Sequence, residues 1–389
     1  MSRSTSRPFE ARLLTALSSL IPKQPQSVAL HGVPDLDDGT LALLHVLIER
    51  GYRPSLLLNG PLPDAMAALV PGGASAVLKD SMQGRWRFLR AETVFTTHDV
   101  YRPHDPPASQ MYVNIWHGEP VGKIGLRWEG DLPPGATWVT ASSPLGAAFR
   151  GVEFGLPPDR VRVLGAPRND RLLNADVKMV RGRVLPSYCQ KLLLWLPTYR
   201  IANGVRVDGT PFESVVPLDD SGLRLLDEWL VANDAVLMTM PHRHRTDQIQ
   251  VADHERIKLI SDEWLAQHQL TLYQLIAAAD VQITDISSVW ADFLLTQKPI
   301  VFHFPDIDEY RTSRGLHLEP FDAWAPGPIT TIADELLSAL SEAIADDHYA
   351  SSRAEMRRLM HTHVDGRSAM RVLDAAGLKG FKNDDMRRE

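Results

Sequence analysis

Two adjacent serines, Ser287 and Ser288, lie where a short apolar strand gives way to a stretch that is typical of a helix. The strand breaks at the polar pair Thr284 and Asp285. A helix begins with unpaired N–H groups and the positive end of its dipole, so hydroxyl residues there can cap the backbone or receive an anionic phosphate. The serines alone leave both interpretations open, a phosphate site and a simple helix cap.

The residues that follow the serines favour the phosphate site. A second apolar strand is predicted over 300–304, and a polar segment comes after it, with Asp308, Glu309, Tyr310, Arg311 and Arg314. Strand, helix and strand with polar groups collected at one end is how nucleotide sites are built in open α/β sheets. Arg311 and Arg314 could contact a phosphate or pair with Glu309. Asp292, one turn after the serines, could orient a ligand hydroxyl or only a backbone turn.

His117 is the candidate general base. It follows a predicted strand over 112–116 and therefore lies at the C-terminal end of that strand. A histidine there has a pKa near working pH and can be oriented by a neighbour. Glu119 could be that neighbour or a solvated loop charge, and Lys123 is also available. A lone histidine is more often structural than catalytic, which is the alternative on these residues.

Further cationic and hydroxyl groups follow other predicted strands. Arg168, in GAPRND, could contact a phosphate through its planar guanidinium or hold an interdomain turn by a salt bridge. Thr198 and Arg200 end the strand KLLLWLPTYR, where Arg200 suits a diphosphate or is a surface arginine. His242 and His244 point the same way on an extended segment. They could bind a metal, but no third ligand is fixed nearby, so contact with a phosphate is favoured.

Composition narrows the class of protein. The 389 residues are 44% hydrophobic and 23% charged, with a formal net charge of −7 and one cysteine, Cys189. The negative charge argues against a nonspecific nucleic-acid binder, and one cysteine allows neither an intrachain disulfide nor a cysteine metal cluster. No run is long and apolar enough to cross a bilayer. We expect a cytoplasmic protein.

The predicted elements alternate strand and helix, which favours two Rossmann-like domains with parallel sheets. We expect an N-terminal domain over 1–180, a second over 185–345, C-terminal helices over 346–376 and a disordered tail over 377–389. The N-terminal domain begins with an amphipathic helix over 8–22, which packs on its own domain or rests on a membrane surface.

The segment TDISSVWADFLLTQKPIVFHFPDIDEYRTSRG resembles the signature of the CDP-glycerol glycerophosphotransferase family, which includes teichoic-acid primases and polymerases and related capsule polymerases. The string WHGEPVGKIG, the block over 138–172 with GAPRND, and LPTYR also resemble the family, in its order. Two positions depart from the family pattern: Tyr199 replaces a tryptophan, and the usual His-Pro is here Pro241 followed by His242-Arg243-His244. We favour His242 as the match to the family histidine.

The resemblance implies a GT-B architecture with a central cleft, a donor nucleotide on the second domain and an acceptor approaching from the first. It implies transfer of glycerol phosphate, or a similar polyol phosphate, from a CDP-linked donor to a prenyl-diphosphate-linked glycan or polymer, with release of CMP. His117 matches the family's proposed base. No cofactor is implied, and a divalent cation is neither required nor excluded. A GT-B sugar transferase or UDP-sugar epimerase, and a non-catalytic nucleotide-binding scaffold, remain as alternatives.

Overall fold

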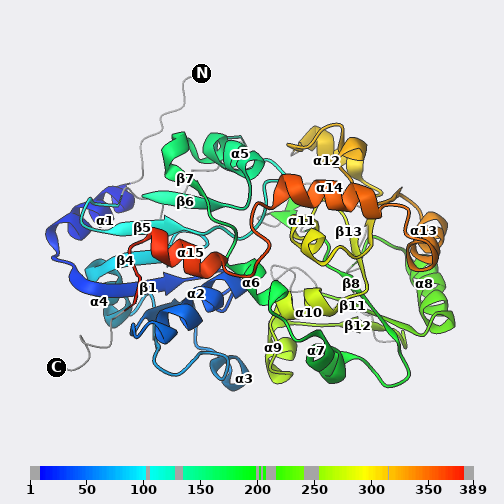
Figure 1. Cartoon of the computed structure of the whole chain (residues 1–389), viewed down its shortest axis with the longest axis horizontal. Coiled ribbons are helices and arrows are strands. Elements are labelled where there is room, and N and C mark those ends of the chain that lie inside the picture. Colours follow the sequence, from blue (N-terminus) through cyan, green and yellow to red (C-terminus); the bar gives the residue numbers. More distant parts are fainter. Residues whose placement is uncertain are drawn as a thin grey trace. The chain divides into compact units, whose positions relative to one another are not determined.

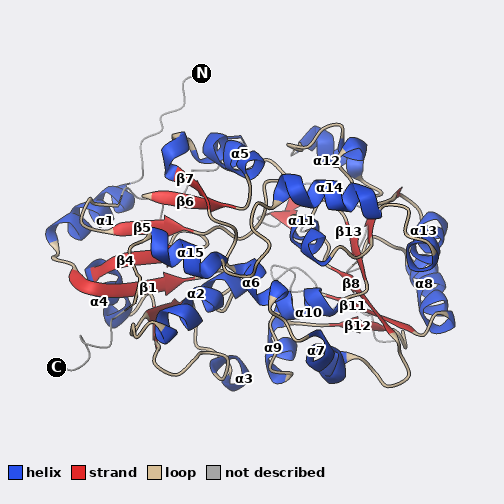
Figure 2. Ribbon diagram, in the orientation of Figure 1, coloured by secondary structure: helices blue, strands red, loops and turns tan. Residues whose placement is uncertain are grey.

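The computed structural model describes residues 9–101, 106–127, 135–198, 201–202, 205–206, 216–240, 254–313 and 315–380 (Figure 1). The chain divides into two compact units. The first comprises residues 1–117, 124–174 and 361–389, and the second comprises residues 118–123 and 175–360. Each unit contains one large sheet of parallel strands with helices against it (Figure 2). Within the described ranges, no helix is long and apolar enough to span a membrane.

The first unit is built on a seven-stranded sheet in which every neighbouring pair is parallel. The order is β3-β2-β1-β4-β5-β6-β7, which is the Rossmann order with one strand added. The strands are β1 (Gln24–His31), β2 (Ser55–Leu58), β3 (Ser75–Leu78), β4 (Ala91–Thr96), β5 (Met111–Asn114), β6 (Trp138–Ala141) and β7 (Val161–Val163).

Helices cover both faces of this sheet, because successive side chains of a strand point to opposite faces. In β1, Leu30 packs in a core cluster with Leu43 and Val372, whereas Ala29 packs in another with Phe88. The helices are α1 (Phe9–Leu20), α2 (Asp38–Glu49), α3 (Asp64–Ala67), α4 (Met82–Arg90), α5 (Pro144–Phe154), α6 (Arg168–Leu173) and α15 (Ser368–Ala375), with short 3₁₀ turns η1 (Gly125–Arg127) and η2 (Pro158–Arg160).

The second unit repeats the plan with a six-stranded parallel sheet in the order β12-β11-β8-β13-β14-β15. The strands are β8 (Lys191–Trp195), β11 (Ala235–Thr239), β12 (Ile257–Leu259), β13 (Val281–Thr284), β14 (Ile300–His303) and β15 (Ile329–Thr330). A separate antiparallel pair joins β9 (Ile201–Ala202) to β10 (Val205–Arg206). The two large sheets confirm the predicted α/β class with two Rossmann-like parallel sheets.

The described helices of the second unit flank its sheet. They are α7 (Val177–Val184), α8 (Asp220–Ala232), α9 (Asp262–Gln267), α10 (Leu272–Ala278), α11 (Val289–Phe293), α12 (Ile307–Ser313), α13 (Ala333–Ala345) and α14 (Ala350–Met360), with η3 (Leu294–Thr296) and η4 (Phe321–Ala323). Helices α8 and α13 pack against a core that contains Leu193, Ile283 and Val301.

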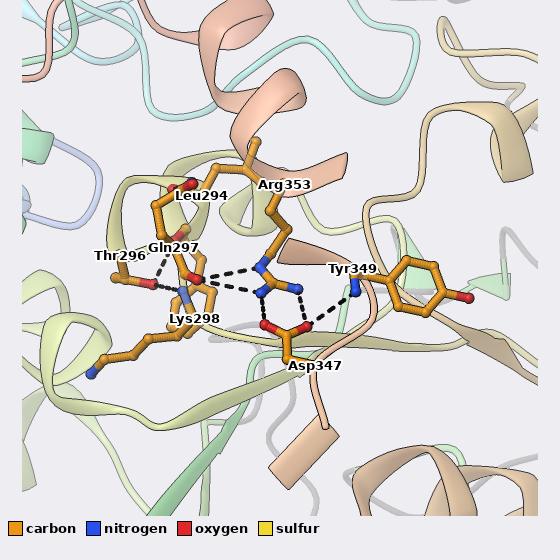
Figure 3. A network of polar contacts seen from close by, with 8 residues as sticks. Leu294, Thr296, Gln297, Lys298, Asp347, Tyr349 and Arg353 are labelled. Carbon is orange, nitrogen blue, oxygen red and sulfur yellow. Dashed lines mark hydrogen bonds and ion pairs between the residues drawn. The ribbon is translucent and has the colours of Figure 1, made fainter. Parts of the chain in front are cut away.

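A buried arginine anchors α14 to the second unit (Figure 3). Arg353 is 1% exposed, and its guanidinium pairs with the carboxylate of Asp347, with Nη1 to Oδ1 at 2.9 Å. It also donates to the backbone carbonyl of Gln297, which has a φ of +58°. Buried charges persist where a partner and hydrogen bonds compensate for lost hydration. This network joins η3 to the start of α14.

The last part of the chain, from residue 361, returns to the first unit. The sequence predicted one block of C-terminal helices over 346–376 and did not separate α15 from α14. Helix α15 packs against α2, far away in the sequence. The carboxylate of Asp170 accepts hydrogen bonds from the backbone N–H groups of Ser368 (2.8 Å) and Ala369 (2.7 Å). Asp170 therefore caps the N-terminus of α15.

Candidate functional site

The order of each sheet reverses at one point, between β1 and β4 in the first unit and between β8 and β13 in the second. Open α/β sheets bind ligands beyond the carboxyl ends of their strands at such a point. Thr198 follows β8, and Asp285 follows β13. In the first unit His31 ends β1, and His98 lies two residues after β4. The fold thus brings chemically capable residues to the expected edge of each sheet.

Asp285 joins the loops at the reversal point of the second sheet. Its carboxylate accepts hydrogen bonds from the N–H of Thr198 (2.9 Å), the hydroxyl of Thr198 (2.5 Å) and the N–H of Ser287 (2.9 Å). The side chain is only 1% exposed. A buried carboxylate held this way fixes the loops after β8 and β13 relative to each other.

The serine helix is shorter than predicted. Helix α11 begins at Val289 with Ser288 as its N-cap residue, and the Ser288 side chain makes no capping hydrogen bond. The simple helix-cap interpretation is therefore not supported for Ser288. Behind the serines, Thr284 is fully buried and its hydroxyl has no hydrogen-bond partner. Asp292 is also fully buried and accepts from the hydroxyl of Tyr273 at 2.7 Å, so it holds α10 to α11.

The segment over 118–123 runs beside this site in the second unit. A Cβ placed on Gly118 would lie 2.3 Å from the Ser288 Oγ, so only glycine allows this close approach. The backbone of Gly122 forms an antiparallel bridge with Leu316, and Val121 accepts from the N–H of His317 at 3.0 Å. The fold thus places the 118–123 segment beside the serine region, which lies about 170 residues later in the sequence.

Two supporting residues lie on this segment. Glu119 is 8% exposed, so it is not the solvated loop charge that the sequence left open. Lys123 contacts Gly315, where a Cβ would lie 2.9 Å from the Lys123 Nζ. Gly315 has a φ of +78°, a conformation that favours glycine.

The structure describes only some of the predicted phosphate contacts, and Arg311 is one of them. Arg311 pairs with Asp308 (3.0 Å) and Glu319 (3.2 Å), and not with Glu309, which the sequence left open as an alternative to a phosphate contact. Glu309 is exposed, and its backbone carbonyl accepts from Thr312. The other predicted contacts lie outside the described residues: Arg200, His242, His244 and Arg314.

His117 of the first unit remains exposed to solvent, which sets it apart from a structural core histidine. Its ring stacks on that of His98, with centroids 4.2 Å apart and planes within 7°. Desolvation by the surrounding protein lowers the pKa of His117 well below its ordinary value, and the nearby His98, Arg150 and Arg168 lower it further. His117 is therefore neutral at physiological pH, as a general base must be.

Trp116 fixes the backbone that presents His117. It has a φ of +49°, an uncommon conformation for a bulky residue, and its N–H donates to the side chain of Asn114 at 2.8 Å. Its ring lies under the Arg150 guanidinium, 5.1 Å from the centroid, and meets Phe154 edge-on at 4.8 Å. Strained residues of this kind persist only where their surroundings determine them, and they cluster at functional sites.

Arg168 lies at the start of α6 and is 5% exposed. Its charge favours the ionised forms of acids nearby, and it lowers the pKa of Asp37, although desolvation raises the pKa of that carboxyl overall. It also acts on His117, so it belongs to the same electrostatic environment. The two interpretations of Arg168 from the sequence, a phosphate contact and an interdomain turn held by a salt bridge, both stay predictions.

Two site neighbours were missed by the sequence analysis, His31 and His98. His98 directly follows a strand that the sequence predicts over 93–97, which is the signal that singled out His117, so the same rule could have found it. His31 is the last residue of β1, inside the strand predicted over 27–32, so that rule does not single it out. Across the described part of the chain, no group of three or more His, Cys, Asp or Glu side chains is placed to hold a metal ion.

The model of one protein family, described as CDP-Glycerol:Poly(glycerophosphate) glycerophosphotransferase, matches residues 62–376. The teichoic acid ribitol-phosphate primase of Bacillus spizizenii is 27% identical over 244 residues, covering 61% of this chain and 58% of that protein. The teichoic acid poly(glycerol phosphate) polymerase of the same organism is 24% identical over 254 residues, covering 60% of this chain and 61% of that protein. This chain therefore spans about 60% of the length of these relatives.

The solved structure of the wall teichoic acid polymerase TagF superposes with a TM-score of 0.73, at 19% identity, covering 94% of this chain and 91% of that chain. At that identity the likeness concerns the fold, and it confirms the predicted GT-B-like architecture. The central cleft of the prediction stays a prediction.

Proposed function

Because the chain belongs to the CDP-glycerol:poly(glycerophosphate) glycerophosphotransferase family, we propose that it transfers a polyol phosphate from a CDP-linked donor to a hydroxyl group. The donor is CDP-glycerol or a related CDP-polyol, and the acceptor is a prenyl-diphosphate-linked glycan or a growing cell-envelope polymer. The observation that carries the proposal is His117, which is exposed, neutral and directly followed by Gly118 against Ser288.

The reaction breaks one phosphoanhydride bond and forms one phosphodiester. The acceptor oxygen attacks the phosphorus that bears the polyol, and its proton passes to the free ring nitrogen of His117. The other ring nitrogen is held by the backbone of Thr97, which fixes the tautomer. The bridging oxygen leaves with its electron pair as part of CMP. General-base assistance of this type contributes about 100-fold to 10,000-fold in rate.

The diphosphate would be neutralised by the groups around Asp285. Asp285 accepts from the Thr198 hydroxyl and the Ser287 N–H, which fixes these loops at the reversal point of the second sheet. The hydroxyls of Ser287 and Ser288 would donate to the diphosphate, and the Thr198 hydroxyl would pass from Asp285 to it. Arg200, His242 and Arg314 would add charge from segments outside the described residues. Asp285, Asp292 and Glu119 act as positioning groups, and Arg311 contributes through its local ion pairs.

Membrane-surface contact through residues 8–22 is the second part of the proposal. Helix α1 leaves Leu13 (49%), Leu17 (41%) and Leu20 (78%) exposed at near-helical spacing, so they form one apolar stripe. Ser18 of the same helix is buried and bonds to Gln110, so the opposite side packs on the first unit. A lipid-linked acceptor would be reached from such a surface.

The donor test is an incubation of the full chain with a prenyl-diphosphate-linked acceptor and, separately, CDP-glycerol, CDP-ribitol and UDP-sugars. The expected result is CMP release from a CDP-polyol that depends on the acceptor. UDP release or sugar isomerisation would instead identify a sugar transferase or epimerase. No turnover with any donor, together with donor binding, would favour a nucleotide-binding scaffold.

A further inference from the structure

Three histidines gather at the carboxyl edge of the first sheet. His31 ends β1, His98 follows β4 and His117 follows β5, and these three strands are neighbours in the sheet. Because the strands are parallel, their carboxyl ends share one edge. The sequence separates the first and last of these histidines by more than eighty residues, and no motif links them.

His98 is the member that touches the proposed base. Its ring lies 4.2 Å from that of His117 with planes 7° apart, and it meets Trp116 at 5.5 Å. Neighbouring threonines hold the His98 loop in place. Thr97 Oγ1 lies 3.2 Å from His98 Nδ1, and the His98 N–H donates to Thr96 Oγ1 at 3.3 Å. The Thr97 contact fixes the ring plane on which His117 stacks, and the Thr96 contact fixes the His98 backbone.

We propose that His98 is a positioning residue that fixes the plane of the His117 imidazole and excludes water from one of its faces. This inference rests on the proposed function of His117 as the base. A ring stacked flat on one face leaves only the opposite face and the edges of His117 open. The nitrogen that takes the proton is therefore directed by the stack, and preorganisation of this kind raises the rate of the chemical step.

The charge state of the stack agrees with this role. Desolvation, with a smaller effect of His31, lowers the pKa of His98 to about 4, so His98 is neutral at physiological pH. The groups that face His117 are His98 from the β4 loop, Arg150 from α5 and Arg168 from α6, with His31 behind His98. His98, Arg150 and Arg168 disfavour a proton on His117, and its bond with the backbone of Thr97 favours one.

The test compares His98→Ala with His98→Phe, which keeps a flat ring in the stack, and with His45→Ala as a control on α2 of the same unit. We expect His98→Ala to lower kcat for CMP release about 10-fold to 100-fold with KM for the donor changed less than about twofold. Water would then reach His117, so the acid limb of its pH–kcat profile should move upward. His98→Phe should keep the kcat and the acid limb of the wild type, and His45→Ala should change neither kcat nor the acid limb.

A second readout does not depend on turnover. Histidine NMR titration of the full chain gives the pKa of His117, and we expect it to rise toward 6.5 in His98→Ala and to stay low in His98→Phe. An unchanged His117 pKa in His98→Ala would overturn the inference, as would a His98→Phe variant as impaired as His98→Ala. If the wild type released no CMP, the proposed function would fail while this titration still decided the role of His98. If His98→Ala did not fold, His98→Leu, which fills the space without a flat ring, would replace it, with the same expected rise of the His117 pKa and fall of kcat.

Discussion

His117 and Gly118 are neighbours in the chain but make opposite demands on their surroundings. His117 needs an open face and surroundings that disfavour its protonated form, so that its ring stays neutral and reachable. Gly118 needs the absence of a side chain, because Ser288 fills the space that a Cβ would occupy. These two demands explain why the proposed base and the serine region are linked through a glycine.

Replacing His117 tests the base directly. We expect His117→Ala to lower kcat about 100-fold to 10,000-fold. The unfolding midpoint should change little, because the side chain is exposed and fills no core position. Steady-state CMP release with a CDP-polyol and denaturant unfolding measure the two quantities. Turnover equal to that of the wild type would remove His117 from the mechanism.

The pH profile follows from the lowered pKa of His117. A general base works when it is neutral, so the rate should fall only on acidification through that pKa. Since the pKa lies well below 6.5, kcat should be flat from about pH 6.5 upward until another group titrates. Rate measurements from acidic to neutral pH check this. An acid limb centred at or above 6.5 would contradict it.

Gly118→Ala tests the contact with Ser288. The added methyl would force the Ser288 hydroxyl or the 118–123 segment to move, and a displacement of that size costs turnover about 10-fold to 100-fold. Gly182→Ala is the matched control, because Gly182 lies exposed on α7 with nothing within 4 Å of a Cβ. That control should keep full activity and gain about 0.5–1 kcal/mol of stability. Equal activity in both variants would argue against a functional Ser288.

At the scale of elements, the strands and their order along the chain could be predicted from the sequence. The residues at which several strands and helices begin or end could not. The strand before His117 was predicted over 112–116 and ends at Asn114, because the Asn114 side chain captures the Trp116 N–H and turns the chain. The serine helix was predicted to open at 287–288 and begins at Val289. Local turn chemistry of this kind leaves no periodic signal in the sequence.

Helix α14 provides the prediction at this scale. We expect Arg353→Met to lower the free energy of unfolding by about 3 kcal/mol, because it leaves the Asp347 carboxylate and the Gln297 carbonyl without their donor. The value is at the low end for a broken buried pair, since Asp347 keeps contact with water. Arg358→Met on the exposed side of α14 is the control and should cost little. Equal urea midpoints for the two variants would contradict the anchoring role.

At the scale of the whole molecule, the alternation of strands and helices was enough to predict two Rossmann-like sheets. The return of α15 to the first unit was not, because the bonds that hold it come from Asp170, nearly two hundred residues earlier. Long-range polar contacts depend on side-chain placement that a single sequence does not encode visibly.

Stability should fall on acidification because three histidines, His31, His98 and His117, have lowered pKa values in the folded chain. The histidines of the unfolded chain bind protons near pH 6.5, whereas those of the folded chain stay neutral to lower pH. The free energy of unfolding present above pH 6.5 is therefore lost as the pH falls toward 4. For His98, a pKa of about 4 corresponds to about 3 kcal/mol across that range. Urea unfolding at pH 7 and pH 5 measures the slope, which His98→Phe should reduce. A protein equally stable at both values would contradict this.

The most direct measurement is the mass of a prenyl-diphosphate-linked acceptor after incubation with CDP-glycerol or CDP-ribitol and either the wild-type chain or His117→Asn. The account predicts that the wild type adds polyol phosphate to the acceptor and releases one CMP for each addition, while His117→Asn leaves the acceptor nearly unchanged. An acceptor that gains a sugar from a UDP donor instead, or one that is extended equally by both proteins, would contradict it.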